Sequence, residues 1–305
     1  MRKQRSNNFF KVSAPADLLL NVYFVILSLV CVLPVVLILM VSFTSEQSLY
    51  NYGYRFFPKD WSLDAYRYLF ADFHIVLRAY GVTIFVAVTG SVLAVLTQAL
   101  YAYPLSRRDF PLRAVFSVII LITMLFSGGL APFYYIYVKV LNIQDTLLAL
   151  ILPGLTGGFS IFMIRTFFRQ TIPFEIIESA KMDGAKEFRI FLRIVLPLSL
   201  PVLATMLLFS VIGYWNDFFN CLLFINNEKL YNLQFMMQKA LINLQFLQTN
   251  FQHLEAQSGK SSFADIPSET IRMAMAVVGM GPIVLTYPFF QKYFVKGLTV
   301  GAVKG

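Results

Sequence analysis

Six long apolar runs constrain this chain more than any other feature of its sequence. A helix of about 20 residues crosses the roughly 30 Å hydrocarbon core of a bilayer, and each run is long enough to do so. Because strand-like alternation is not found in them, the runs predict an all-α integral membrane protein. The second and fifth runs are longer than needed, which predicts tilt or protruding ends. The expected spans lie near Leu18–Val41, Ile75–Ala102, Leu112–Tyr134, Leu147–Phe168, Val195–Phe224 and Ile271–Phe290.

The distribution of charge predicts the orientation of these spans. Only 13% of the residues are charged, against about a quarter in soluble domains, so the chain needs lipid around it. With the N-terminus in the cytoplasm, 16 of the 25 Lys and Arg residues fall inside, and the other nine fall outside beside nine acidic residues. This distribution follows the positive-inside rule and predicts about six transmembrane helices, N-in and C-in. The formal net charge of +9 therefore indicates topology, and no basic and aromatic cluster indicates nucleic-acid binding.

The first apolar run predicts a span that stays in the protein. It exceeds the about 7–15 apolar residues of a signal-peptide core, and no small-residue cleavage site followed by a soluble domain is found. We therefore expect a cytoplasmic tail over residues 1–17 and a single transmembrane domain over residues 18–305.

Residues suited to catalysis or metal binding are sparse. Cys31 and Cys221 lie in predicted spans without C-x-x-C spacing, which favours buried free thiols. His74 and His253 lie in different outer loops, too isolated for a metal site. Gly259-Lys260-Ser261 resembles the end of a phosphate-binding loop, but the first glycine of that motif is replaced by Leu and no strand precedes it. No other phosphate-binding loop is found in the sequence, so any ATP must be hydrolysed by another chain. We expect no catalytic residue, cofactor or metal in this chain.

A polar, charged segment over residues 171–197 separates the fourth and fifth runs. Pro173 suits the first position of a helix, and Glu175 suits its first turn. Asp183-Gly184 should end that helix, because glycine adopts the left-handed conformation at no steric cost. The segment therefore predicts a helix-turn-helix on the inner membrane face, with an amphipathic helix held by anionic lipid as the alternative. The second helix should have one apolar and one basic face, formed by Phe188, Phe191, Leu192 and Val195 and by Lys186, Arg189 and Arg193.

This segment resembles the coupling loop of ABC-importer permeases, E-A-A-x-x-D-G-A followed by an aliphatic residue and L-P-L-x-x-P. The match runs from Glu178 to Ala185 and on through Ile194 and Pro197 to Pro201, with Ser179 in place of the usual alanine. Three further stretches resemble maltose-permease-like subunits of carbohydrate importers, at Pro58–Tyr66, Gly213–Phe219 and Gln291–Gly305. Ser127-Gly128-Gly129 and the span-five stretch are most similar to the subgroup that handles larger oligosaccharides in Gram-positive bacteria.

The resemblance implies a multi-pass subunit of the bacterial cell membrane that moves a carbohydrate inward and is not itself an enzyme. Its partners would be a second homologous permease, two copies of a cytosolic ATPase that binds ATP and Mg, and an extracellular solute-binding protein. ATP-driven closure of the ATPases would move the coupling loop, with Gly184 setting its bend. The residues expected to meet the ATPase are Glu178, Ser179, Ala180, Asp183, Gly184, Ala185 and Pro197.

A translocation path is expected around Tyr214-Trp215-Asn216-Asp217, where aromatic rings stack on sugar faces and polar groups bind hydroxyls. Asp217 is the only acid deep in a predicted span, a place where a charge is costly and usually faces a cavity or partner. The alternative is that Asp217 lies near the outer interface or pairs with a base of another subunit. The outer loop 226–269 is too long for a bare connector and resembles the segment that reaches into the binding protein.

Smaller features concern helix packing and the outer surface. Ser127-Gly128-Gly129 should break the third span, and Pro153-Gly154 the fourth. Gly154 and Gly158 form a G-x-x-x-G pattern, which is typical of close helix packing. The aromatic loop Ser42–His74 indicates an interfacial belt or, alternatively, a platform for an external partner.

Two other functions fit a polytopic chain. An ion-coupled secondary sugar transporter often has internal repeats and intramembrane acids, of which this chain offers Asp217 alone. A membrane enzyme acting on lipid-linked sugar would need convergent acids or histidines at one face, and these are scattered here.

Overall fold

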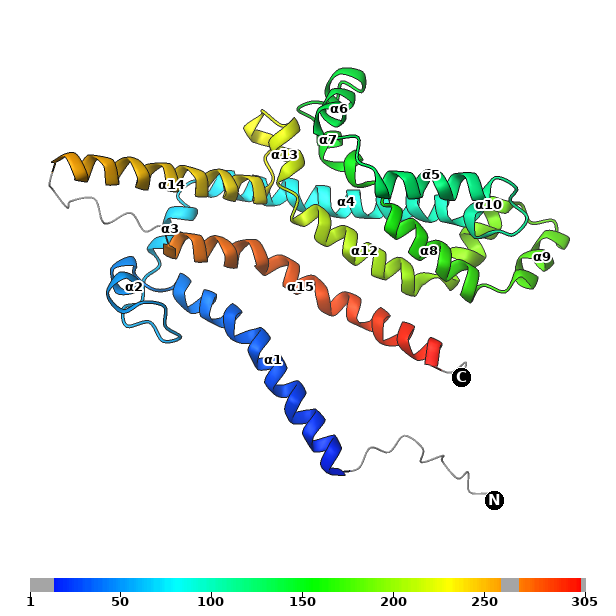
Figure 1. Cartoon of the computed structure of the whole chain (residues 1–305), viewed down its shortest axis with the longest axis horizontal. Coiled ribbons are helices and arrows are strands. Elements are labelled where there is room, and N and C mark those ends of the chain that lie inside the picture. Colours follow the sequence, from blue (N-terminus) through cyan, green and yellow to red (C-terminus); the bar gives the residue numbers. More distant parts are fainter. Residues whose placement is uncertain (1–13, 259–268, 303–305) are drawn as a thin grey trace. The chain divides into compact units, whose positions relative to one another are not determined.

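The computed structural model describes residues 14–258 and 269–302, and the predicted all-α fold is confirmed for this part of the chain. Within it, the only strand-like pairing is a single bridge between Thr44 and Trp61. The elements are α1 (Ala14–Ser42), α2 (Glu46–Tyr52), α3 (Asp64–Leu69), α4 (Phe73–Ser106), α5 (Arg113–Leu125), α6 (Leu130–Tyr135), η2 (Ile136–Val140), α7 (Leu147–Ile151), η3 (Leu152–Gly154), α8 (Gly158–Thr171), α9 (Phe174–Met182), α10 (Glu187–Ile190), η4 (Phe191–Val195), α11 (Leu196–Leu198), α12 (Leu200–Trp215), α13 (Phe219–Phe224), η5 (Glu228–Leu230), α14 (Leu233–Ser258) and α15 (Glu269–Ala302) (Figure 1).

The chain divides into two compact units. The first comprises the described residues of Met1–Ala71 and Gln248–Val278. Within it, Glu46 accepts hydrogen bonds from the backbone N–H groups of Glu269 and Thr270 at 3.1 and 3.0 Å, so its carboxylate caps the start of α15. Most large apolar side chains of α1 are exposed within the single chain, as expected for a helix that faces lipid or another subunit.

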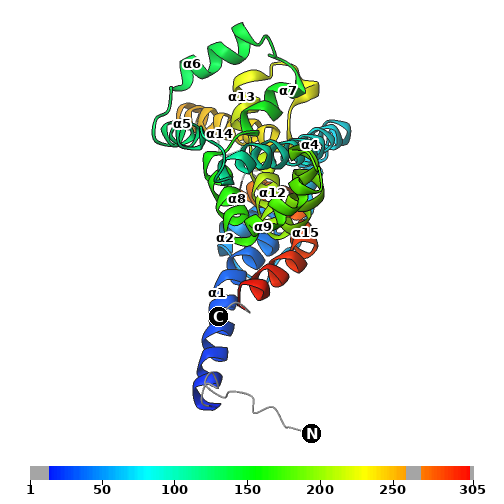
Figure 2. The same cartoon turned by 90° about the vertical axis from the view of Figure 1, so that its right-hand side faces the viewer.

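The second unit comprises the described residues of Asp72–Leu247 and Gly279–Gly305. Its axis is α4, a 34-residue helix that lies beside α8 and α12 (Figures 1 and 2). Ala94, Ala99 and Ala102 on α4 are completely buried. Small residues let helix backbones approach closely, so α4 packs in the way typical of membrane helices.

Two helices are each long and apolar enough to cross a membrane, Pro15–Ser42 and Phe73–Ser106. Three further candidates are bent pairs, which brings the described residues to as many as five spans. The predicted sixth span, Ile271–Phe290, lies within α15, which is not among these candidates. The count of six spans therefore stays a prediction. The bent pairs are Arg113–Leu125 with Leu130–Val140 at 113°, Leu147–Gly154 with Gly158–Thr171 at 51°, and Glu187–Leu198 with Leu200–Trp215 at 82°.

The predicted breaks in the third and fourth spans are confirmed. The helix α5 ends before Ser127-Gly128-Gly129, and a 3-10 turn at Pro153-Gly154 precedes α8. Gly154 and Gly158 both pack closely, although they belong to different helices: an added Cβ would meet the Tyr214 ring at Gly154 and the Met124 side chain at Gly158.

The fifth run, expected as one overlong span that tilts or protrudes, is not a single continuous helix. It breaks at residues 216–218, between α12 and α13. Here Asp217 accepts hydrogen bonds from the backbone N–H of Asn220 at 3.1 Å and from its side-chain amide at 2.6 Å. A carboxylate that accepts a hydrogen bond from a free backbone N–H favours the start of a helix. Asp217 therefore lies just before the first turn of α13 and not inside a helix.

The segment 226–269, which is predicted to be an outer loop, is largely helical where it is described, since α14 occupies most of it. The Gly259-Lys260-Ser261 stretch lies outside the described residues. The C-terminal stretch Gln291–Gly305 is helical through Ala302, and residues 303–305 also lie outside them.

Candidate functional site

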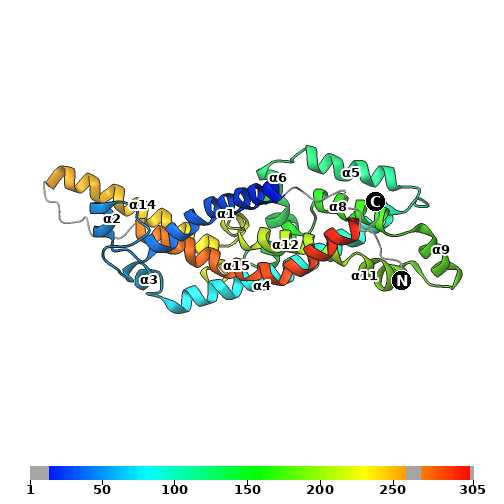
Figure 3. The ribbon, with the colours of Figure 1, turned by 90° about the horizontal axis from the view of Figure 1, so that it is seen from below.

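The predicted helix-turn-helix is present at one end of the second unit, where α9 leads into α10 (Figure 3). Gly184 has a φ of 79°, a conformation that suits glycine. The backbone N–H of Ala185 donates to the carbonyl of Ala180, and that of Gly184 donates to the carbonyl of Lys181, each at 2.9 Å. This pair of bonds is the Schellman motif, so the turn is fixed by backbone hydrogen bonds that require a left-handed residue at position 184.

The residues of the motif divide by burial. Glu178, Ser179, Asp183 and Gly184 are exposed, and so is Pro197 further along the chain. Ala180 and Ala185 are half-buried and pack against the hydrophobic core of the unit. The polar face of the turn is therefore open to a partner, whereas its small apolar residues hold it to the helix bundle.

Two details of this segment were predicted wrongly. Pro173 is the cap of α9 with an extended ψ of 138°, one position before the first helical residue. The apolar face of the second helix is also different, because Phe188 and Leu192 are exposed. The π-helical turn at Phe191–Val195 widens the helix and moves side chains away from a 3.6-residue period.

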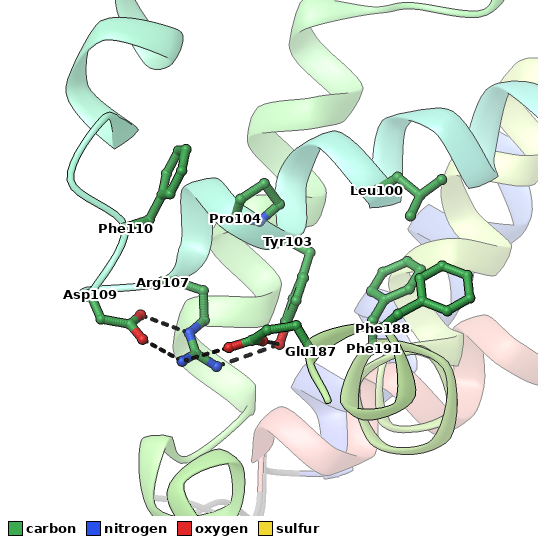
Figure 4. Close-up of a pocket in the computed structure, with 9 residues that line it drawn as sticks. All are labelled: Leu100, Tyr103, Pro104, Arg107, Asp109, Phe110, Glu187, Phe188 and Phe191. Atoms are coloured by element: carbon green, nitrogen blue, oxygen red, sulfur yellow. Dashed lines mark hydrogen bonds and ion pairs between the residues drawn. The ribbon is translucent and has the colours of Figure 1, made fainter. Parts of the chain in front are cut away.

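Four charged side chains form a closed ring between this segment and the end of α4, which we call the charged ring: Arg107, Asp109, Lys181 and Glu187. Figure 4 shows three of them, Arg107, Asp109 and Glu187. Arg107 holds Asp109 with two nitrogens, at 2.9 and 2.7 Å. Lys181 Nζ lies 3.1 Å from Asp109 and 2.7 Å from Glu187. Arg107 lies 3.7 Å from Glu187 and closes the ring. Each cation thus contacts both anions.

The charged ring holds its members in their charged forms. The hydrogen bonds from Arg107 keep the pKa of Asp109 well below its usual range. The hydrogen bond to Glu187, followed by the one to Asp109, raises the pKa of Lys181. The Arg107 side chain is only 6% exposed, so these carboxylates compensate the cost of burying its positive charge.

A hollow of about 430 Å³ adjoins the charged ring (Figure 4). Its remaining lining is aromatic and aliphatic. The Tyr103 hydroxyl donates to Glu187 at 2.6 Å, and the rings of Tyr103 and Phe191 lie 5.4 Å apart. The other lining residues are Leu100, Pro104, Phe110 and Phe188.

A second cavity, of about 330 Å³, lies where the fourth and fifth runs break. Of the four residues expected along a path, Tyr214 and Asp217 line it, together with Pro153, Gly154, Ser210, Gly213 and Asn220. Trp215 and Asn216 are not among its lining residues. The cavity combines a carboxylate, an amide and a hydroxyl with a small apolar wall, so it offers hydrogen bonds to polar groups.

The two aromatic residues of this stretch pack the helix bundle. The Tyr214 hydroxyl donates to the carbonyl of Ile151 at 2.7 Å, and the Trp215 indole donates to that of Gly279 at 2.9 Å. Both side chains are buried. Buried aromatic residues that find a hydrogen-bond partner are typical of structural anchors.

Sequence reasoning missed the charged ring. From the sequence, Arg107 and Lys181 indicate only the orientation of the spans, and neither is paired with an acid. In the sequence Asp109 follows Arg107 by two residues and Glu187 follows Lys181 by six, but this spacing does not show that the two pairs meet. Among residues 14–258 and 269–302, no group of three or more His, Cys, Asp or Glu side chains is placed to hold a metal ion.

The chain is similar to known transport proteins over nearly its whole length. The chain is 37% identical to the polygalacturonan/rhamnogalacturonan transport system permease protein YtcP of Bacillus subtilis (strain 168), over 95% of this chain and 98% of that one. It is 40% identical to Protein LplC of the same organism, over 90% of each. A solved bacterial ABC transporter involved in the import of the acidic polysaccharide alginate has 27% identity and a TM-score of 0.74, covering 94% of this chain and 99% of that one. The model of binding-protein-dependent transport system inner membrane components matches residues 10–300, and the chain belongs to this family.

Proposed function

We propose that this chain is a permease subunit of an ATP-binding-cassette importer that moves a carbohydrate, of the oligosaccharide class, into the bacterial cytoplasm. The observation that carries the proposal is the exposed face of α9 and its turn, with Glu178, Asp183 and Gly184 free of the helix bundle. Membership of the family and the sugar substrates named for its relatives support the class of cargo. An ion-coupled secondary carrier is not favoured, because a carrier of that kind needs no exposed docking turn.

The proposed arrangement has six spans with both termini in the cytoplasm, a tail over residues 1–17, a coupling loop over 171–197 and an outer loop over 226–269. The partners are a second homologous permease, two copies of a cytosolic ATPase that binds ATP and Mg, and an extracellular solute-binding protein. Six residues of the motif meet the ATPase: Glu178, Ser179, Ala180, Asp183, Gly184 and Ala185. Pro197 begins the return into the bilayer.

We place the sugar path at the 330 Å³ cavity. The Asp217 carboxylate and its neighbouring amide would bind sugar hydroxyls there, while Tyr214 forms part of the wall. The buried Trp215 and the exposed Asn216 lie between Tyr214 and Asp217 in the sequence but do not line the cavity. Asp217→Asn should therefore lower uptake while the ATPase stays bound.

The test compares two exposed acids on the same helix. Glu178→Ala changes the motif, whereas Glu175→Ala removes the same charge one turn earlier, outside the motif. The tagged full chain is purified in mild detergent and its co-purifying proteins are identified. We expect the unaltered chain and Glu175→Ala to recover a second multi-span protein and an ATPase, and Glu178→Ala to lose the ATPase while still inserting.

Recovery of the unaltered chain alone, stable and monodisperse, would overturn the proposal. Uptake that stops with an ionophore but persists after ATP depletion would also contradict it and support the secondary carrier. Equal ATPase recovery by both alanine variants would remove Glu178 from the docking site.

A further inference from the structure

The charged ring joins segments that are distant in the sequence. Arg107 and Asp109 follow α4, Lys181 lies in the last turn of α9, and Glu187 begins α10. Lys181 lies within the motif, between the exposed Glu178 and Asp183, yet its amino group contacts two carboxylates of the ring. Side chains therefore bond the docking turn to the C-terminal end of α4 and to the loop that follows α4.

We propose that the charged ring transmits movement of the coupling segment to α4, with Lys181 and Glu187 as its positioning residues. The inference rests on the proposed function, since it needs an ATPase that moves the segment. It adds a route within this chain, from the docking turn to the cavity.

The ring is better suited to holding segments together than to binding a ligand. It contains two cations and two anions, and each cation already lies within 4 Å of two carboxylates. No member is left with an unmatched charge to attract an anionic or cationic ligand. Paired charges with fixed geometry resist separation, which is the property that a mechanical link needs.

The contacts of Glu187 make the link to α4 firm. Its carboxylate accepts from Tyr103 at 2.6 Å and lies 3.7 Å from Arg107. Pro104 lies between these two residues and removes one backbone hydrogen bond from the last turns of α4. Because Glu187 contacts Tyr103 before this proline and Arg107 after it, a flexible joint at the proline would not uncouple the helix from α10.

The helix α4 then reaches the cavity. Gly90 lies 13 residues before Tyr103 on the same continuous helix, a rise of roughly 20 Å. There the helix packs directly on the Tyr214 ring, since a Cβ added at Gly90 would lie 2.7 Å from that ring. Tyr214 lines the 330 Å³ cavity. A displacement at the ring therefore has an unbroken packed route to the proposed sugar path.

The experiment follows the cavity with a reporter thiol. Ser210→Cys is placed in the cavity wall, with Cys31→Ser to remove the exposed native thiol, while Cys221 is fully buried. The full transporter with its ATPase is placed in nanodiscs. The rate of labelling by a water-soluble maleimide is measured with and without Mg and a non-hydrolysable ATP analogue.

Lys181→Gln is the informative ring variant. Lys181 and Glu187 are 38% and 53% exposed, so the variant leaves no deeply buried charge unpaired, and Arg107 keeps its two bonds to Asp109. We expect the nucleotide-dependent change in labelling to fall by roughly fivefold or more, the lower range of coupling between linked sites. ATPase recovery should stay unchanged, which a docking defect would not allow. Lys181→Arg should restore the response.

Lys186→Gln is the matched control, because it removes the same charge from the same exposed turn outside the ring. A full labelling response in Lys181→Gln, with the ATPase bound, would overturn the ring proposal and leave the proposed function standing. An equal loss in Lys181→Gln and Lys186→Gln would also overturn it. No nucleotide response with an unaltered ring, or no bound ATPase, would instead count against the proposed function.

Discussion

The Tyr214 ring packs between two glycines of different elements, and this contact allows a quantitative prediction. A Cβ built at Gly90 on α4 or at Gly154 in η3 would lie 2.7 Å from the Tyr214 Cζ atom. Real Cβ contacts are essentially never that short, and the hydroxyl bond to Ile151 holds the ring in place. Gly90→Ala and Gly154→Ala should therefore overpack the same site.

Overpacking of a tight core costs about 1–3 kcal/mol. Gly90 lies inside a helix, where alanine regains about 0.5–1 kcal/mol of backbone entropy, so Gly154→Ala should be the more destabilising change. In a domain of about 150–250 residues, 1 kcal/mol lowers the melting temperature by about 2–4 °C. The double variant should lose less than the sum of the two, because both substitutions displace one ring.

The assay is thermal unfolding of the purified permease in detergent, with Gly81→Ala as the control. Gly81 lies on α4 with nothing within 4 Å of an added Cβ, so that variant should be as stable as the unaltered chain or more so. A melting temperature for Gly154→Ala equal to that of Gly81→Ala would show that Tyr214 is not confined. Tyr214 would then be free to serve as a mobile path residue.

Further predictions concern the turn, the charged ring and α4. Gly184→Ala should destabilise the folded turn by about 1–2 kcal/mol and Gly184→Asn by less, because φ there is 79°; equal melting temperatures for the two variants would contradict the left-handed turn. Asp109, whose pKa is lowered, contributes stability that is lost only as pH falls through its folded pKa. Lys181, whose pKa is raised, contributes stability that is lost only as pH rises through its own. The stability that the charged ring contributes should therefore be constant from about pH 5 to pH 9. A difference in melting temperature between the unaltered chain and Lys181→Gln that changes inside that window would contradict the ring. Thr83→Val should cost about 1–3 kcal/mol by leaving the N–H of Leu233, now bonded at 2.8 Å, without an acceptor, whereas Thr83→Ser should keep the melting temperature.

The features that the sequence predicts best are local ones. Apolar length predicts helices at α1 and α4, and glycine with proline predicts the breaks at Ser127-Gly128-Gly129 and Pro153-Gly154. The end of α9 at Asp183-Gly184 is confirmed because a left-handed glycine is set by its own backbone. These signals need no knowledge of distant residues.

The features that escaped prediction depend on distant partners or on helix type. The charged ring requires the end of α4 to meet α9 and α10, and residue spacing does not reveal that meeting. Phe191 is buried while Phe188 is exposed, and the π-turn at Phe191–Val195 shifts the side chains that follow it without a clear sequence signal. The break at Asp217 escaped because a long apolar run conceals a single capping carboxylate.

The breaks in the fourth and fifth spans have a consequence for bending. Their backbone carbonyls accept hydrogen bonds from side chains: Leu155 accepts from Thr97 at 3.0 Å and from Gln98 at 3.2 Å, and Asp217 accepts from Asn232. A side-chain amide or hydroxyl can follow a carbonyl through a rotation that would rupture a helical ladder. The angle between the two halves of each span can thus change while these two carbonyls keep their hydrogen-bond donors, as a backbone in hydrocarbon requires.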